Sequence, residues 1–135
     1  MDADLDLGRA LVAAPGWVWR AGMLALMPAE GRHPACTCRI VGDAPFPGIS
    51  GYTGRLGLVG LDLSAIPDLD DPATAGVIVG MLREAVPGWT VEILMLRAHV
   101  EVCVGSPGSG GRTVHVDTSL GRAAARAWLS TKERA

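Results

Sequence analysis

The residues with the clearest potential for catalysis form the sequence His115-x-Asp117-x-Ser119. Alternation along a strand puts His115 and Asp117 on one face, where a carboxylate can orient an imidazole. Glu92 or Glu101 from a neighbouring strand would complete a general acid–base pair. Asp117 and Ser119 suit a helix cap equally well, and Ser119 lacks the glycine pattern of a nucleophile elbow. We therefore name no catalytic residues and keep His115 and Asp117 as candidates only.

A second group combines side chains that bind zinc: His33, Cys36 and Cys38. A strand would place the two thiols on one face, beside the imidazole. The spacing lacks the C-x-x-C pattern of a zinc knuckle, and two small buried cysteines in a strand explain it as well. We expect no metal and no cofactor, and these three residues remain metal candidates. A fourth ligand would have to be Cys103, His99 or His115.

The glycine-rich stretch Ser106–Arg112, which includes Ser109, is a candidate phosphate-binding loop. Successive N–H groups of such a turn can point at an anion, and the guanidinium of Arg112 is a forked donor. The stretch lacks the Gly-Lys-Ser/Thr ending of a P-loop and lies between two expected strands. A flexible hairpin loop is the alternative interpretation.

Aromatic and arginine side chains gather near expected loops. Flat rings stack on nucleobases, and guanidinium groups bind phosphates in a forked geometry. The loop Asp43–Arg55 contains the single Phe and the single Tyr of a chain whose aromatic content is only 4%. Such rings are poor core filler in a loop, so they favour a ligand surface. The residues expected to bind ligand are Trp17, Trp19, Arg20, Phe46, Tyr52, Arg55, Ser109 and Arg112.

The element that organises the rest of the chain is a helix within Ile66–Trp89. Asp70 and Asp71 offer carboxylate oxygens to the free N–H groups of a first turn, and Pro72 suits the first helical position. Pro87-Gly88 ends the helix. Its apolar face repeats at helical spacing and consists of Val77, Ile78, Met81, Leu82 and Ala85.

The other elements follow from the same signals. Val100, Val102 and Val104 alternate along the sequence, which predicts that they share one face of a strand. Leu11–Trp19 and Arg83–Val91 share the order helix, Pro-Gly, Trp, strand, which suggests two similar halves. We predict a single α+β domain over residues 1–135, with about three helices on an antiparallel or mixed sheet in the order α-β-β-β-α-β-β-β-α. The expected elements are a helix at Asp4–Ala14, a strand or hairpin at Trp17–Met27 bending at Ala21-Gly22, strands at Cys36–Gly42 and Leu56–Leu63 (an edge), a hairpin of Trp89–Leu96 and His99–Val104, a strand at Thr113–Asp117, and a closing helix capped by Thr118 or Ser119.

Composition narrows the class of protein. Hydrophobic residues make up 49% of the 135 residues and charged ones 19%, as in a globular domain. The formal charge of −2 gives no reason to expect broad nucleic-acid binding. Three cysteines do not close a disulfide framework, no signal peptide is evident, and no apolar run reaches the length of a membrane span. We expect a cytoplasmic protein without membrane contact.

The runs PDLDDPATAGVIVGMLREAVPGW, PGWVWRAGMLAL and VHVDTSLGRAAARAWL resemble small phage and prophage proteins of the ABA (α/β/α) sandwich type. The resemblance covers roughly two thirds of the chain and departs from it in the loop 43–55 and in GSPGSGG. It implies a bacteriophage origin, and hence a bacterial host cell, with no agreed activity. It carries over no functional residues.

No complete catalytic set is present, so a binding protein is favoured. Our hypothesis is a non-enzymatic phage accessory protein that acts in counter-defence by sequestering a nucleotide-derived immune signal. The binding site would be a cup formed by loop 43–55, the Pro-Gly-Trp junctions and the Arg112 loop. The alternative is a module that binds a host defence protein or the virion, and a small hydrolase ranks below both. A homo-oligomer paired through the edge strand Leu56–Leu63 is a further expectation.

Overall fold

The structure, a computed structural model, describes residues 2–27, 36–40, 50–53, 57–60, 65–108 and 111–133. It confirms the predicted α+β class with three helices. Within these described ranges, no helix is long and apolar enough to cross a bilayer. The elements along the chain are α1 (Asp2–Ala13), β1 (Leu24–Met27), β2 (Cys36–Ile40), β3 (Ser50–Thr53), β4 (Gly57–Gly60), β5 (Ile66–Pro67), α2 (Pro72–Ala85), β6 (Thr90–Met95), β7 (Val100–Gly105), β8 (Arg112–Asp117) and α3 (Leu120–Glu133).

The strands form two antiparallel sheets, of order β4-β3-β2-β1-β5 and β6-β7-β8. The first half therefore has five strands where three were expected, because the short β3 and the two-residue β5 add to the pairing. β4 lies at an edge, as predicted for Leu56–Leu63. β1 begins at Leu24 instead of Trp17, because the chain bends at Ala21-Gly22, where Gly22 has a φ of 96°.

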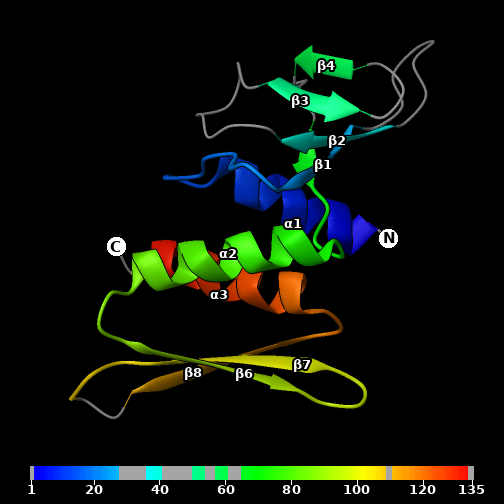
Figure 1. Cartoon of the computed structure of the whole chain (residues 1–135). Helices are drawn as coiled ribbons and strands as arrows, with labels where there is room; N and C mark the ends of the chain where they lie inside the picture. The colour runs from blue at the N-terminus through cyan, green and yellow to red at the C-terminus, as the bar shows by residue number, and fades with distance from the viewer. Residues whose placement is uncertain are drawn as a thin grey trace.

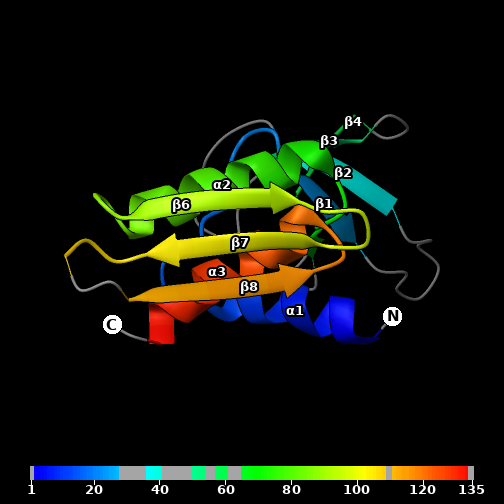
Figure 2. The same cartoon turned by 90° about the horizontal axis from the view of Figure 1, so that it is seen from below.

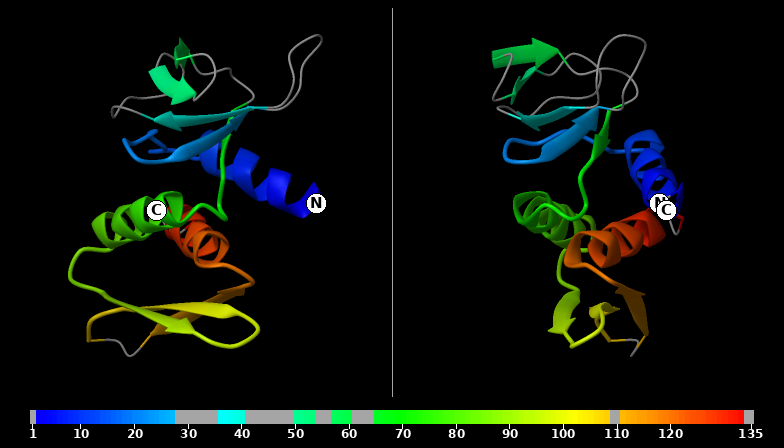
Figure 3. Two further views of the ribbon diagram at one scale, coloured as in Figure 1. Left: turned by 45° about the vertical axis from the view of Figure 1, so that its right-hand side comes forward. Right: turned by 90° about the vertical axis from the view of Figure 1, so that its right-hand side faces the viewer.

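The helices lie between the two sheets (Figures 1 and 3). α2 and α3 pack side by side against one face of β6-β7-β8, while α1 and the five-stranded sheet lie on their other side. The layers thus run sheet, helices, sheet, which differs from the α/β/α order that the resemblance implies. The composition of α3 explains the difference, because the consecutive buried alanines 123–125 span about 200° of its circumference and allow packing on more than one side.

The start of α2 is tied to the five-stranded sheet by one polar cluster. Asp71 is the N-cap and accepts a hydrogen bond from the backbone N–H of Thr74 at 2.9 Å, with Pro72 in the first turn, as predicted. Arg39 of β2 binds both oxygens of Asp71, at 2.7 and 3.2 Å. The fully buried Thr74 hydroxyl accepts from the N–H of Leu24 at 2.8 Å. These bonds fix α2 relative to β1 and β2.

The two Pro-Gly-Trp segments form the same local turn. Gly16 and Gly88 have φ values of 85° and 81°, a conformation that glycine adopts without steric cost. The N–H groups of Trp17 and Trp89 each bond the carbonyl three residues earlier, at 3.2 and 3.1 Å. The repeated sequence therefore reflects a repeated helix ending. After the turn the two segments differ, since only Trp89 leads directly into a strand.

Candidate functional site

The pairing of β6, β7 and β8 decides which side chains face the helices. Directly opposed residues in an antiparallel sheet share a face, and Val91, Val104 and Thr113 form one such row across the three strands. Val100, Val102 and Val104 are buried on this inner face, which confirms the alternation predicted for β7. The row of Val91, Val104 and Thr113 lies at the end of the sheet where α2 and α3 also end (Figure 2).

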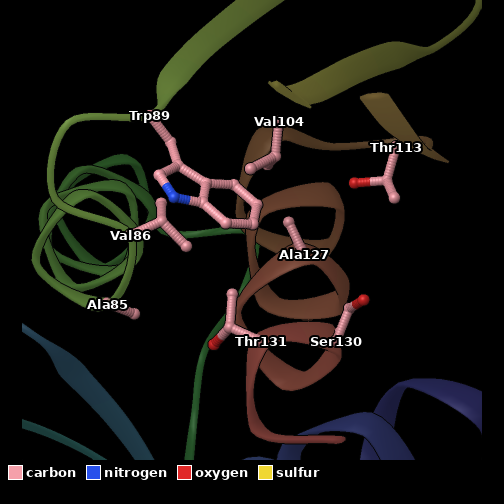
Figure 4. A pocket seen from close by; sticks show the side chains of 8 residues that line it. All are labelled: Ala85, Val86, Trp89, Val104, Thr113, Ala127, Ser130 and Thr131. Carbon is pink, nitrogen blue, oxygen red and sulfur yellow. The ribbon is translucent and has the colours of Figure 1, made fainter. Parts of the chain in front are cut away.

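A pocket of about 260 Å³ lies at this end of the sheet (Figure 4). The indole of Trp89 extends across it from the end of α2 toward α3, with Ala127 beyond its ring. None of the eight lining residues is ionisable, and three carry hydroxyl groups. The lining consists of Ala85, Val86, Trp89, Val104, Thr113, Ala127, Ser130 and Thr131.

Local structure places each part of this lining. The turn at Gly88 turns the chain back toward the sheet and leaves Trp89 half-buried instead of in the core. The last turns of α3 bring Ser130 and Thr131 to the opposite wall. The Thr131 hydroxyl donates to the carbonyl of Trp128 at 2.6 Å, and the Thr113 hydroxyl lies 3.3 Å from Nε2 of His115. The walls are therefore held by their own hydrogen bonds.

The chemistry of this lining favours binding over catalysis. An indole offers a large flat apolar face, and hydroxyls can both donate and accept hydrogen bonds. Among the described residues no ionisable side chain lines the pocket, and the nearest imidazole, that of His115, reaches it only through the Thr113 hydroxyl. The arrangement is suited to a small molecule that stacks on Trp89 and carries few polar groups.

Trp17 and Trp19 belong to the core, which corrects their expected place on a ligand surface. Their exposed fractions are 7% and 0%, and their rings meet edge to face with centroids 5.5 Å apart. Trp17 also packs edge to face on Trp128 at 6.0 Å, and the Lys132 ammonium lies 4.6 Å from the centre of the Trp128 ring. Three of the four tryptophans are thus used for packing, because the helices and the five-stranded sheet cover them from both sides.

The arginines of the expected ligand set lie apart from one another. Arg20 pairs with Glu84, the residue before pocket-lining Ala85, at 2.6 Å. Arg112 starts β8, and its side chain lies on the opposite face of the sheet from the pocket, 3.9 Å from Glu92. Its pKa is raised above the usual value by the hydrogen bond to the Cys103 thiol and then by the neighbouring negative charges.

The remaining members of the expected ligand set are only partly placed. The backbone of Tyr52 lies in β3, opposite Arg39 of β2. Phe46, Arg55 and Ser109 lie outside the described residues. The proposed cup of three loops therefore stays a prediction. Of its parts, the second Pro-Gly-Trp junction and the chain leading out of the Arg112 loop meet at the same end of the sheet.

The catalytic candidates have structural partners. Asp117 accepts from Nε of Arg126 at 2.6 Å and from the Thr118 N–H at 2.7 Å. Burial raises the pKa of Asp117, but these bonds more than offset burial, so its pKa lies below the usual value. Ser119 accepts from the Arg122 N–H at 3.3 Å, as expected for the cap of α3. The carboxylate that would orient His115 is thus engaged at the start of α3.

The metal candidates are only partly described. Cys38 is fully buried in β2, whereas His33 and the side chain of Cys36 fall outside the described residues. Within the part of the chain that the structure describes, no three His, Cys, Asp or Glu side chains form a group that could hold a metal ion. Cys38 packs in the hydrophobic core, and the metal candidates stay a prediction.

The sequence did not predict this pocket, and Trp89 is not among the residues expected to bind ligand. Trp89 was predicted to enter the sheet, and the Pro-Gly-Trp repeat was the signal that set it apart. Comparisons with protein-family models, with curated proteins and with solved structures found no match to this chain. The geometry of the pocket is therefore the basis for a functional conclusion.

Proposed function

We propose that this chain is a non-catalytic binding protein whose ligand is a small, flat, largely uncharged molecule held against the indole of Trp89. The observation that carries the proposal is the pocket itself, a preformed hollow with one aromatic wall and three hydroxyl groups, whose described lining holds no ionisable side chain. Small-molecule sites are typically apolar with a few polar groups that fix orientation.

The size of the pocket limits the ligand class. Its volume of about 260 Å³ is close to the lower limit of roughly 300 Å³ for small-molecule sites. This space suits a single ring system with a few substituents, such as a nucleobase. A phosphate group would remain outside the lining, because a buried charge needs a partner that these residues lack.

The biological role we propose is sequestration of a nucleotide-derived immune signal by a phage accessory protein. The base would enter the pocket, while the sugar and phosphates would lie at its mouth. Support comes from the stacking surface of Trp89 and from the likeness of the sequence to small phage proteins. A protein that only stores or hides a ligand needs no acid–base group at the ring, which agrees with the lining.

A thermal-shift series with adenosine, cyclic AMP and ADP-ribose tests the proposal. A ligand at tenfold excess over its Kd stabilises by about 1.4 kcal/mol, which raises Tm by about 5 °C for a domain of this size. Binding through the base predicts similar shifts for all three. No shift with any of them would refute the base-binding proposal.

Three variants sharpen this experiment, each compared with its own unliganded Tm. Trp89→Ala removes the stacking surface and should abolish the shift, whereas Trp89→Phe keeps a flat ring and should retain most of it. Arg112→Ala is the matched control, because that side chain lies on the other face of the sheet. An adenosine shift that survives Trp89→Ala but disappears with Arg112→Ala would place the ligand elsewhere.

A further inference from the structure

The face of β6-β7-β8 that points away from the helices carries exposed apolar side chains. In Figure 2 this sheet lies in front of α2 and α3, and no other described element covers it. Leu94, Val114 and Val116 are 42%, 49% and 49% exposed, and the strand register places all three on this outer face. Leu96, 47% exposed, extends the same side of β6 into the turn, whereas the more exposed Met95 belongs to the opposite face.

The outer face has a raised end and a hollow end. At the raised end, Leu94 and Val116 flank Glu101. At the other end, Gly105 lies between Thr90 and Arg112, and because it has no side chain a hollow of about 220 Å³ opens there.

Between these two ends lies a middle row that crosses the three strands. It consists of Glu92, the buried Cys103 and Val114.

We propose that two copies of this chain associate through their outer faces, related by a two-fold axis that runs across the strands along the middle row. This axis places the raised end of each copy over the hollow end of the other. Glu101 then faces the space above Gly105 of the second copy, beside Arg112, and the opposite contact forms by symmetry. Val114, Cys103 and Glu92 each meet their own equivalents along the axis, and each Glu92 has Arg112 of its own copy 3.9 Å away to offset the like charges.

The shape and the charges of the outer face indicate that its binding partner is a second copy of the same chain. Both the raised row and the hollow that could receive it belong to the same chain, as an isologous contact requires. The same holds for the charges, because Glu101 of the raised row, which lies 3.0 Å from Nε2 of His99, and Arg112 of the hollow row, 3.9 Å from Glu92, have opposite sign and would add a second partner each. A foreign partner would need neither match.

The apolar area of the outer face determines how tightly two copies are expected to associate. The exposed apolar side chains contribute on the order of 300 Å², the size of the largest apolar patch on a typical monomer. Two stacked faces with their polar neighbours would bury about 1,000 Å² in total, near the lower limit of specific interfaces. We therefore expect a weak dimer with a Kd in the micromolar range. The ligand pocket lies on the inner face, so this inference does not depend on the proposed ligand.

Sedimentation equilibrium of the full chain, from about 1 to 500 µM, tests the interface over the range of a micromolar Kd. Val116→Glu places a carboxylate on the raised row and should weaken the dimer roughly 100-fold. Met95→Glu is the matched control, a change of a more exposed side chain on the other face, and should leave Kd unchanged. Circular dichroism of each variant separates loss of association from loss of fold.

Charge reversal tests the orientation of the axis. Glu101→Arg and Arg112→Glu should each weaken association, and the double variant should restore it, because the pairing is rebuilt with opposite signs. A wild-type monomer at every concentration would overturn the proposal, and so would equal weakening by Val116→Glu and Met95→Glu. A double variant no tighter than either single variant would overturn the proposed axis.

Discussion

Gly121 in the first turn of α3 is the position where a single added methyl group should have the largest effect. At Gly121 the helix touches the backbone of Leu69, just before the start of α2. A Cβ at Gly121 would overlap the carbonyl oxygen of Leu69 and lie 2.8 Å from its carbonyl carbon. Carbon atoms normally approach to about 3.5–4.0 Å. Since the obstacle is backbone instead of a flexible side chain, relief requires α3 to move by about 1 Å, away from the helix it packs on.

The expected cost follows from two opposing effects. Overpacking a close contact destabilises by about 1–3 kcal/mol, and this overlap is at the severe end of that range. Alanine gains up to about 1 kcal/mol over glycine inside a helix, and less in a first turn. We therefore expect Gly121→Ala to lower the free energy of unfolding by about 2 kcal/mol.

Urea unfolding measures this change, and α2 provides matched controls. A Cβ on Gly76 or Gly80 would meet no atom within 4 Å. Gly76→Ala and Gly80→Ala should each raise the free energy of unfolding by about 0.5–1 kcal/mol through helix propensity. The same chemical change should thus have opposite signs in the two helices. A Gly121→Ala protein as stable as the wild type would refute the close packing of α3 on Leu69.

The polar cluster at the start of α2 gives two further predictions, both read from urea unfolding. The hydrogen bond from Arg39 holds the pKa of Asp71 below its usual value, so the stabilisation from this carboxylate is present above the unfolded pKa of about 3.9 and is lost as pH falls through the folded value. Asp71→Asn can still cap the helix but loses the negative charge that Arg39 binds. Because Arg39 is partly exposed, we expect the free energy of unfolding at pH 7 to fall by only about 1 kcal/mol. The variant should also lose less stability than the wild type as the pH falls, and an unchanged dependence of stability on pH would contradict this. Thr74→Val leaves the Leu24 N–H without its acceptor and should lower the free energy of unfolding by about 1–2 kcal/mol. Thr74→Ser keeps the hydroxyl and should lower it less. A larger loss for Thr74→Ser would assign the effect to packing.

The sequence predicted local structure well where local chemistry decides it. Asp71 and Pro72 marked the start of α2, and Ser119 the start of α3, because a cap is satisfied by neighbours within one turn. The Pro-Gly-Trp repeat predicted two equivalent turns for the same reason. The alternation of Val100, Val102 and Val104 predicted the buried face of β7.

Tertiary features were harder to predict. Alternation along the expected strand would place Trp17 and Trp19 on one face, but β1 begins only at Leu24, and no local pattern shows that both rings are buried between the helices and the five-stranded sheet. The order of the layers depends on which sides of α3 are covered by other elements. The alanines of α3 can pack on any side of the helix, so the sequence does not show which sides are covered. The pocket joins residues from Ala85 to Thr131 across three elements, and no local pattern links them.

The most direct test of the proposed function uses the four tryptophans as reporters in an NMR titration. Each indole N–H of Trp17, Trp19, Trp89 and Trp128 gives one resonance, and Trp89→Phe assigns that of Trp89. With adenosine added to saturation, the account predicts that the Trp89 signal shifts while those of the three core rings stay in place. An unchanged Trp89 signal while adenosine stabilises the protein, or larger shifts of Trp17 and Trp19, would contradict a ligand held against Trp89.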